Sequence, residues 1–157
     1  FHPRKSDLVR LVREACERQR ELYPGRDFRL ELEGLPQAVR FDPLLMDQVL
    51  TNLISNATKY SPDSTQVHVM GETREDVVVL TVKDLGVGIP EEELPRVFER
   101  FFRASTATGV SGTGIGLHVA REIVRMHGGE LTLSSRMGEG TAVHLTLPHD
   151  DQQQAAE

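Results

Sequence analysis

Hydrophobic side chains recur every three or four residues in three stretches of the chain, and this spacing predicts three amphipathic helices. The stretches cover residues 8–22, 43–60 and about 115–127. The second begins at Asp42-Pro43, where an aspartate can cap a helix and a proline fits its first turn, and it ends before Ser61-Pro62. Gly128-Gly129 ends the third helix, because glycine readily adopts the left-handed conformation that closes a helix.

Segments of alternating or mainly apolar residues predict strands in the rest of the chain. These segments are residues 28–32, 67–69, 77–82, 130–135 and 141–147. The run VVVLTV at 77–82 is apolar enough to lie centrally in a sheet. A short turn at 74–76 predicts an antiparallel hairpin with the preceding strand, and MGEG at 137–140 joins the last two strands into another.

The order of these elements predicts one α+β domain over residues 1–149. We expect a two-layer sandwich, in which a mixed, mainly antiparallel sheet of about five strands carries the three main helices on one face. Residues 91–97 predict a short helix with acidic side chains in its first turn. Residues 104–112 are small and aperiodic, which predicts a mobile loop, and residues 150–157 predict a disordered tail.

Composition narrows the class of protein. The 157 residues are 38% hydrophobic and 27% charged, which is ordinary for a globular domain and disfavours global disorder. A net charge of −6 without a long basic run disfavours a nucleic-acid partner. The chain has no bilayer-spanning apolar run, no signal peptide and no initial methionine, so we expect a cytoplasmic fragment of a longer protein. The single cysteine, Cys16, favours a reducing compartment and is expected to be buried on a helix.

Residues 109–117, GVSGTGIGL, place four glycines immediately before the third predicted helix. The pattern is not a P-loop, because Ile115 and Gly116 stand where that motif has lysine and a hydroxyl. It is not a dinucleotide fingerprint either, because no strand precedes the glycines. Two interpretations stay open for the motif alone: a hinge at the entry to a helix, or a cradle in which backbone amides and the helix dipole bind phosphate.

Two further groups carry candidate chemistry. Asn52, Asn56 and Lys59 fall on one face of the second predicted helix, although asparagine is a poor helix former. They are either exposed to solvent or offer amide oxygens to a hard cation and an ammonium to phosphates. Asp84 ends the most apolar strand, and it either starts a glycine turn or accepts a hydrogen bond from the amine of a purine.

Four stretches, taken in order, resemble the catalytic ATP-binding domain of sensor histidine kinases, within the Bergerat-fold ATPase/kinase superfamily. QVLTNLISNATKYS (48–61) resembles the family's N box, and DLGVGIP (84–90) resembles its first glycine box. VFERFFR (97–103) resembles the phenylalanine box, and GTGIGL (112–117) resembles the second glycine box. The similarity extends over about residues 7–147, and four motifs in order are far more specific than any one of them.

The resemblance implies that the domain binds ATP with Mg²⁺, and it assigns roles at the phosphates. Asn56 is the expected principal magnesium ligand, and Asn52 lines the same site. Lys59 and Arg103 are expected to meet the phosphates, so the expected catalytic residues are Asn56, Lys59 and Arg103. The second glycine box is expected to cradle the phosphates beneath a lid of about residues 104–111, through Gly112, Thr113, Gly114, Ile115, Gly116 and Leu117.

At the base, the resemblance implies that Asp84 accepts the adenine amine, that Tyr60 packs against the ring and that Thr141 supports Asp84 through water. The residues that let the backbone close on the ring are Gly86, Gly88 and Ile89. The chain has Leu85 where the family usually has asparagine. An altered nucleotide affinity is therefore expected, without loss of binding.

The resemblance favours a protein-histidine kinase over an ATP hydrolase. Related hydrolases place a water-activating glutamate one helical turn before the magnesium asparagine, and this chain has Asn52 there. A histidine acceptor needs such a base less, because neutral imidazole presents a lone pair. None of the six histidines stands in the family's phosphorylation context, so we expect the acceptor histidine on a domain outside the fragment.

The implied partners are that helical dimerisation and phosphoacceptor domain, in a homodimeric full-length kinase, and a downstream response regulator. We expect no nucleic acid, no structural metal and no direct membrane contact for this domain, and the resemblance is compatible with a membrane-anchored parent. Two alternatives come from other classes. One is a nucleotide-binding or scaffold domain without kinase activity, and the other is an ATP hydrolase of the same fold.

Overall fold

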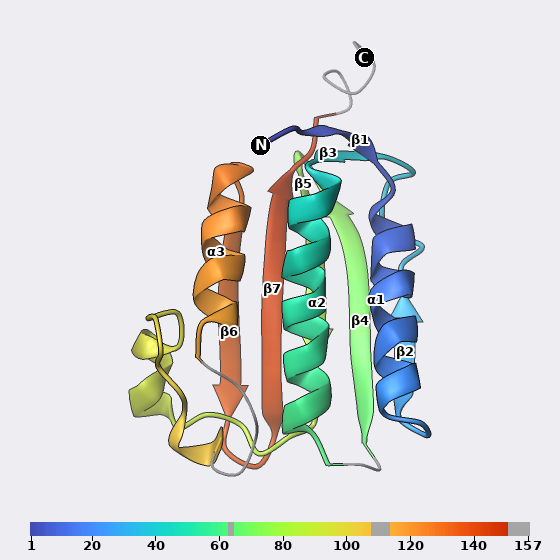
Figure 1. The fold of residues 1–157 in the computed structure, drawn as a ribbon. Coiled ribbons are helices and arrows are strands. Elements are labelled where there is room, and N and C mark those ends of the chain that lie inside the picture. Colours follow the sequence, from blue (N-terminus) through green and yellow to red (C-terminus); the bar gives the residue numbers. More distant parts are fainter. Residues whose placement is uncertain (63–64, 108–113, 151–157) are drawn as a thin grey trace.

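The computed structural model describes residues 1–62, 65–107 and 114–150. Figure 1 shows three α-helices in one layer against one face of a five-stranded sheet. The helices are α1 (Leu8–Leu22), α2 (Pro43–Tyr60) and α3 (Gly116–Met126). The strands of this sheet are β2 (Asp27–Glu31), β4 (Gln66–Arg74), β5 (Val77–Lys83), β6 (Glu130–Arg136) and β7 (Gly140–Pro148). The α+β class and the layer of helices on one face of the sheet are confirmed.

The five strands follow the order β2-β4-β5-β7-β6. β2 and β4 are parallel, and the other neighbours are antiparallel, so the sheet is mixed and mainly antiparallel as expected. The hairpins β4–β5 and β6–β7 are both present. β5 is the middle strand, and its helix-facing residues Val78, Leu80 and Val82 are each 1% exposed. Asp84 directly follows this buried strand, which places a carboxylate between the sheet and the helices.

The helices begin where the sequence gives a physical reason. Asp7 caps α1 by accepting the backbone N–H of Arg10 at 3.0 Å. Asp42 caps α2 by accepting the backbone N–H groups of Leu44 and Leu45 at 3.0 and 3.2 Å. α3 differs, because no side chain of the described residues caps its N-terminus at Ile115. Its first backbone amides are therefore available to a ligand.

The sequence pattern does not predict a second sheet, in which β1 (Arg4–Ser6) pairs antiparallel with β3 (Val39–Phe41). Each of these strands has three residues, too few to show alternation. The N-terminal segment reaches the ends of two helices here. The His2 N–H donates to Asp42 Oδ2 at 2.8 Å, and the Asp42 N–H donates to His127 Nε2 at 3.0 Å. These contacts join the start of α2 to the end of α3.

Two short 3-10 helices complete the described elements, η1 (Glu91–Arg96) and η2 (Ser105–Ala107). Pro95 lies inside η1 and has no amide hydrogen, which prevents a longer α-helix at the predicted short helix. Residues 108–113 of the expected loop and residues 151–157 of the expected tail lie outside the described residues. Each helix among the described residues is too short or too polar to span a lipid bilayer. Cys16 is buried on α1, and burial raises the pKa of its thiol to about 11.

Candidate functional site

A cavity of about 250 Å³ lies between the C-terminal half of α2, the start of α3 and the chain that follows β5. Its lining brings together most of the predicted site residues. These are Asn52, Asn56, Lys59, Tyr60, Asp84, Gly88, Ile89, Arg103, Gly114, Gly116, Leu117 and Thr141. Gly86 and Ile115 adjoin the lining along the chain, whereas Gly112 and Thr113 lie outside the described residues.

One face of α2 turns three polar side chains toward the cavity. Asn52, Asn56 and Lys59 are half-buried and all line it. Asn52 Nδ2 donates to the carbonyl oxygen of Gly116 in α3 at 3.3 Å. Neither Asn56 Oδ1 nor Lys59 Nζ has a hydrogen-bond or ion-pair partner within residues 1–62, 65–107 and 114–150. Both groups are therefore free to bind a ligand. Their half-buried position at a cavity argues against the interpretation that they are simply exposed to solvent.

Asp84 supplies a buried carboxylate to the same cavity, with 6% of the residue exposed. Its Oδ1 accepts the backbone N–H of Gly86 at 2.8 Å and that of Thr141 at 3.3 Å. Oδ2 has no hydrogen-bond partner among the described residues. Burial raises the pKa of the carboxyl above its ordinary value, and the two amide donors oppose the rise. A buried acceptor with one unoccupied oxygen is suited to a donor group of a ligand.

Ser135 of β6 does not line the cavity but contacts two residues that do, Ile89 and Thr141, and the sequence prediction missed it. Its hydroxyl accepts the backbone N–H of Ile89 at 2.8 Å, donates to Gly140 O at 2.9 Å and lies 2.9 Å from Thr141 Oγ1. Ser135 and Thr141 are direct partners across β6 and β7, so their side chains lie on the same face of the sheet. Nothing in the local sequence around Ser135 indicates these contacts, because they depend on the register of two strands and on a distant loop.

Gly86 and Gly88 let the loop after β5 approach two other backbones. A Cβ on Gly86 would lie 2.2 Å from Tyr60 O at the end of α2. A Cβ on Gly88, where φ is +79°, would lie 2.1 Å from Arg136 O at the end of β6. Close backbone packing therefore requires glycine at both positions even without a ligand.

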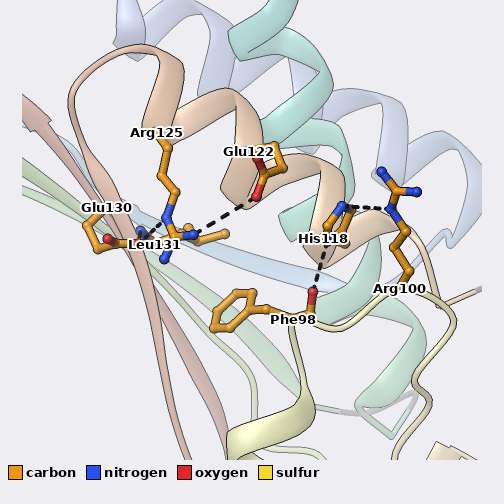
Figure 2. Close-up of polar contacts among 7 residues, drawn as sticks. All are labelled: Phe98, Arg100, His118, Glu122, Arg125, Glu130 and Leu131. Carbon is orange, nitrogen blue, oxygen red and sulfur yellow. Dashed lines mark hydrogen bonds and ion pairs between the residues drawn. The ribbon is translucent and has the colours of Figure 1, made fainter.

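Side chains of α3 hold the segment that follows η1. Figure 2 shows His118 between Phe98 and Arg100: its Nδ1 is 3.1 Å from Phe98 O, and Arg100 Nε donates to its Nε2 at 3.0 Å. Arginine is only a donor, so Nε2 is the acceptor and Nδ1 carries the proton that His118 donates to Phe98 O. The guanidinium of Arg121 lies 4.8 Å from the centre of the Phe98 ring. These contacts fix the chain shortly before Arg103.

The charge of the cavity differs from that of the chain. Its charged lining residues within the described ranges are Lys59, Arg103 and Asp84, so cations exceed carboxylates here, although the net charge of the chain is −6. Arg103 Nη2 donates to Ala107 O at 3.3 Å. The uncapped N-terminus of α3 adds partial positive charge at Gly116, which also lines the cavity. This part of the cavity is suited to an anion.

A metal ion at this site would need oxygen ligands. The described part of the chain contains no cluster of three or more His, Cys, Asp or Glu that could hold a metal. The amide oxygens of Asn56 and Asn52, the two predicted ligands, both line the cavity without a hydrogen-bond partner among the described residues. Mg²⁺ accepts one or two protein oxygens and completes its shell with water and phosphate oxygens, so these residues fit magnesium better than zinc.

Known proteins share this sequence pattern and fold. Residues 41–151 match the family described as Histidine kinase-, DNA gyrase B-, and HSP90-like ATPase. Sensor histidine kinase WalK of Bacillus subtilis (strain 168) is 40% identical over 135 residues, which cover 83% of this chain and 21% of WalK. The chain therefore spans about a fifth of this curated relative.

Two solved structures superpose on nearly the whole chain. Mycobacterial sensor histidine kinase MprB has a TM-score of 0.83 and 28% identity, and the match covers 94% of this chain and 97% of that one. The catalytic domain of histidine kinase ThkA, in a nucleotide-free form, has a TM-score of 0.82 and 27% identity, with 98% and 99% covered. The similarity thus extends over the whole layered fold.

Proposed function

Because this chain belongs to the histidine kinase-, DNA gyrase B-, and HSP90-like ATPase family, we propose that its cavity binds ATP with Mg²⁺ and holds the γ-phosphoryl group for transfer to a histidine. Within the family it is a catalytic ATP-binding domain of the sensor histidine kinase type. One observation carries the proposal: a single cavity combines a buried carboxylate with a free oxygen, two cationic side chains and an uncapped helix N-terminus.

The base of the nucleotide would lie beside Asp84. Its free Oδ2 would accept the exocyclic amine of adenine, while the amides of Gly86 and Thr141 hold Oδ1 and so fix the plane of the carboxylate. Tyr60 and Ile89 line the same cavity and would contact the ring. Recognition of the base thus depends on a carboxylate that is oriented before the ligand arrives.

The triphosphate would lie along α2 and the start of α3. Lys59 and Arg103 would neutralise its charge, and backbone amides at Gly114 and Gly116 would donate to its oxygens, as would those of Gly112 in the segment outside the described residues. Asn56 Oδ1 would hold Mg²⁺, with Asn52 beside it, and the bound ion would withdraw charge from the phosphate oxygens. Phosphoryl transfer requires mainly this positioning and neutralisation.

Two observations favour a kinase over the alternatives. Asn52 stands where related hydrolases have a water-activating glutamate, and Asp84, beside the base in this proposal, is the one carboxylate among the described lining residues. A bound water would therefore lack a general base near the phosphates. Leu85 is 52% exposed and does not line the cavity, so its departure from the family pattern gives little support to an inert scaffold.

The phosphoacceptor would be a histidine on a separate helical dimerisation domain of the full-length homodimeric kinase, which would then pass the phosphoryl group to a response regulator. This assignment is supported by the cavity, because no histidine is among its described lining residues. We place the domain in the cytoplasm, where ATP is available, without nucleic acid and without direct contact to a membrane. Residues 1–149 would form the catalytic domain, followed by the tail.

Calorimetry with a non-hydrolysable ATP analogue, with and without Mg²⁺, tests nucleotide binding. We expect binding that Mg²⁺ strengthens and that Asp84→Ala abolishes, while the matched control Asp47→Ala, at an exposed surface ion pair, retains it. Absence of binding to the wild-type chain would refute the proposal.

Transfer is tested by joining the upstream helical phosphoacceptor domain to this chain and measuring acid-labile phosphohistidine after addition of labelled ATP. We expect label on the added domain. Steady release of phosphate without that domain would instead identify a hydrolase, and binding without label or release would identify a scaffold.

A further inference from the structure

We propose that Ser135 determines purine specificity by fixing the direction in which the Thr141 hydroxyl points its proton. The inference rests on the proposed ATP site and deepens it. In this proposal, Ser135 and Thr141 affect the choice of purine through hydrogen bonding and not through the shape of the cavity. Ser135 would act through Thr141, and is therefore a positioning residue.

The hydrogen-bonding capacity of Ser135 is fully used. A serine hydroxyl has one proton and two lone pairs. One lone pair accepts the Ile89 N–H at 2.8 Å, and the proton is donated to Gly140 O at 2.9 Å. Thr141 Oγ1 lies 2.9 Å from Ser135 Oγ, and the second lone pair of Ser135 is left for this contact. With the Ser135 proton on Gly140 O, Thr141 is the donor in this contact.

In this arrangement the Thr141 hydroxyl can only accept further hydrogen bonds, through the lone pairs of its oxygen. Its only side-chain proton is used on Ser135, and its oxygen belongs to a residue that lines the cavity. Asp84, which lines the same cavity, offers the free oxygen Oδ2. Together these two side chains present hydrogen-bond acceptors to a ligand and no donor, as long as the carboxyl is ionised.

A pair of acceptors distinguishes a 6-amino purine from a 6-oxo purine. The 6-amino group donates hydrogen bonds to both acceptors. A 6-oxo oxygen would instead face their lone pairs and would have no hydrogen-bond donor. A water between Thr141 and Asp84 gives the same selectivity. It would use both of its protons on their two oxygens, and so would offer a lone pair to the amine.

Removal of the Ser135 hydroxyl would free the proton of Thr141. That proton could then point into the cavity, or allow a bridging water to do so, and donate to a 6-oxo group. Ser135→Ala is therefore expected to improve relative binding of inosine triphosphate, which carries an oxo group where ATP carries the amine. The net value of one hydrogen bond corresponds to a change of roughly fivefold to tenfold in the ratio of the two dissociation constants.

Competition titrations of ATP and inosine triphosphate against a fluorescent ATP analogue test the inference with the chain as it is. The wild type and Ser135→Thr, which keeps the hydroxyl, are expected to share one ATP preference. Ser135→Ala is expected to reduce it. Thr141→Val is expected to reduce it as well, and Ser135→Ala added to Thr141→Val is expected to change the ratio no further.

Each outcome has a definite meaning. An unchanged ratio in Ser135→Ala would overturn the inference, and so would a further change in the double variant, since Ser135 would then act through Ile89 or the backbone. If Ser135→Ala does not fold, an unchanged ratio in Thr141→Val overturns it instead. Failure of the wild type to bind either nucleotide would refute the proposed function itself, whereas binding with an unmoved ratio would refute this inference alone.

Discussion

Phe101 donates its backbone N–H to the carbonyl oxygen of Gly114 at 2.9 Å, so the two ends of the segment between them are held together. Gly114 has a φ of +79°, and a Cβ there would lie 2.7 Å from the carbonyl carbon of Phe101. We predict that Gly114→Ala separates these ends, lowers the melting temperature and weakens binding of the ATP analogue. The left-handed conformation alone costs an alanine roughly 1–2 kcal/mol, and the clash adds to it.

Gly138 provides a matched control for this change. Its φ is also +79°, but a Cβ there would meet no atom within 4 Å. Gly138→Ala should therefore show the backbone strain alone, as a lower melting temperature with little change in affinity. Equal losses of affinity in the two variants, measured by calorimetry, would contradict a specific role for the Phe101–Gly114 contact.

The stability of the ligand-free protein should depend on Asp84. Burial raises the pKa of this carboxyl above its ordinary value, so the folded chain keeps its proton to a higher pH than the unfolded chain does. Between these two pKa values the folded state binds more protons. Its free energy of unfolding therefore falls as the pH rises through this window, and the loss persists above it. Chemical denaturation at a series of acidic pH values measures this trend, which Asp84→Asn should remove.

Nucleotide binding should have the opposite dependence on pH. Asp84 Oδ2 accepts the amine only when it carries no proton, so ATP affinity should fall as the pH is lowered through the raised pKa. Asp84→Asn keeps an oxygen for the amides of Gly86 and Thr141 but turns a donor toward the ligand. We predict at least roughly a tenfold loss of ATP affinity at neutral pH without loss of stability. Asp47→Asn is the control, and unchanged affinity in Asp84→Asn would exclude the proposed base contact.

Asn56 should determine how much Mg²⁺ strengthens ATP binding. Its side-chain oxygen lines the cavity and has no other partner among the described residues. We predict that Asn56→Leu keeps most of the affinity measured in EDTA but loses about tenfold of the affinity measured with Mg²⁺. Ser55→Ala changes the neighbouring lining residue and should retain the full magnesium effect. A magnesium effect of wild-type size in Asn56→Leu would disprove the assignment.

His118 should contribute to ATP affinity without touching the nucleotide. It holds Phe98 and Arg100 through its two ring nitrogens, and Arg103 follows Arg100 by three residues. We predict that His118→Leu weakens binding of the ATP analogue roughly fivefold, the value of about one net hydrogen bond. Glu122→Gln is the control, because Glu122 lies on the same helix and pairs with Arg125 instead (Figure 2). Equal affinities of the two variants would show that this anchor does not position Arg103.

The periodicity of the sequence was sufficient to predict the helices and the five-stranded sheet. Asp42 starts α2 and Gly128 ends α3 through local interactions, which a sequence pattern records directly. The pairing of β1 with β3 was not predictable in this way. Strands of three residues are too short to show alternation, and their pairing brings together segments about 35 residues apart, just before α1 and just before α2.

In the candidate site, too, local spacing was predictable from the sequence and contacts between distant segments were not. The spacing of Asn52, Asn56 and Lys59 on one helix places them on one face, and they indeed line one cavity. Ser135 escaped prediction, because its partners lie on another strand and on a loop 46 residues earlier. Thr141 donates its backbone N–H directly to Asp84, a contact that the resemblance did not imply. The contacts of Ser135 and of Thr141 both depend on the placement of segments that are distant in the sequence, which no short motif contains.

The contact between Asp42 and His127 has a mechanical consequence for the cavity. It pins the C-terminal end of α3 to the first turn of α2, while the other end of α3 lies at the cavity, where Gly116 meets Asn52. The 11 residues of α3 span about 16 Å, so the contact at His127 lies about that far from the cavity. A tilt of α3 by about 5° at His127 would move the amides at its cavity end by about 1.4 Å, which is enough to make or break a hydrogen bond. A small rotation of α3 at His127 would therefore change the distance from these amides to a phosphate in the proposed site.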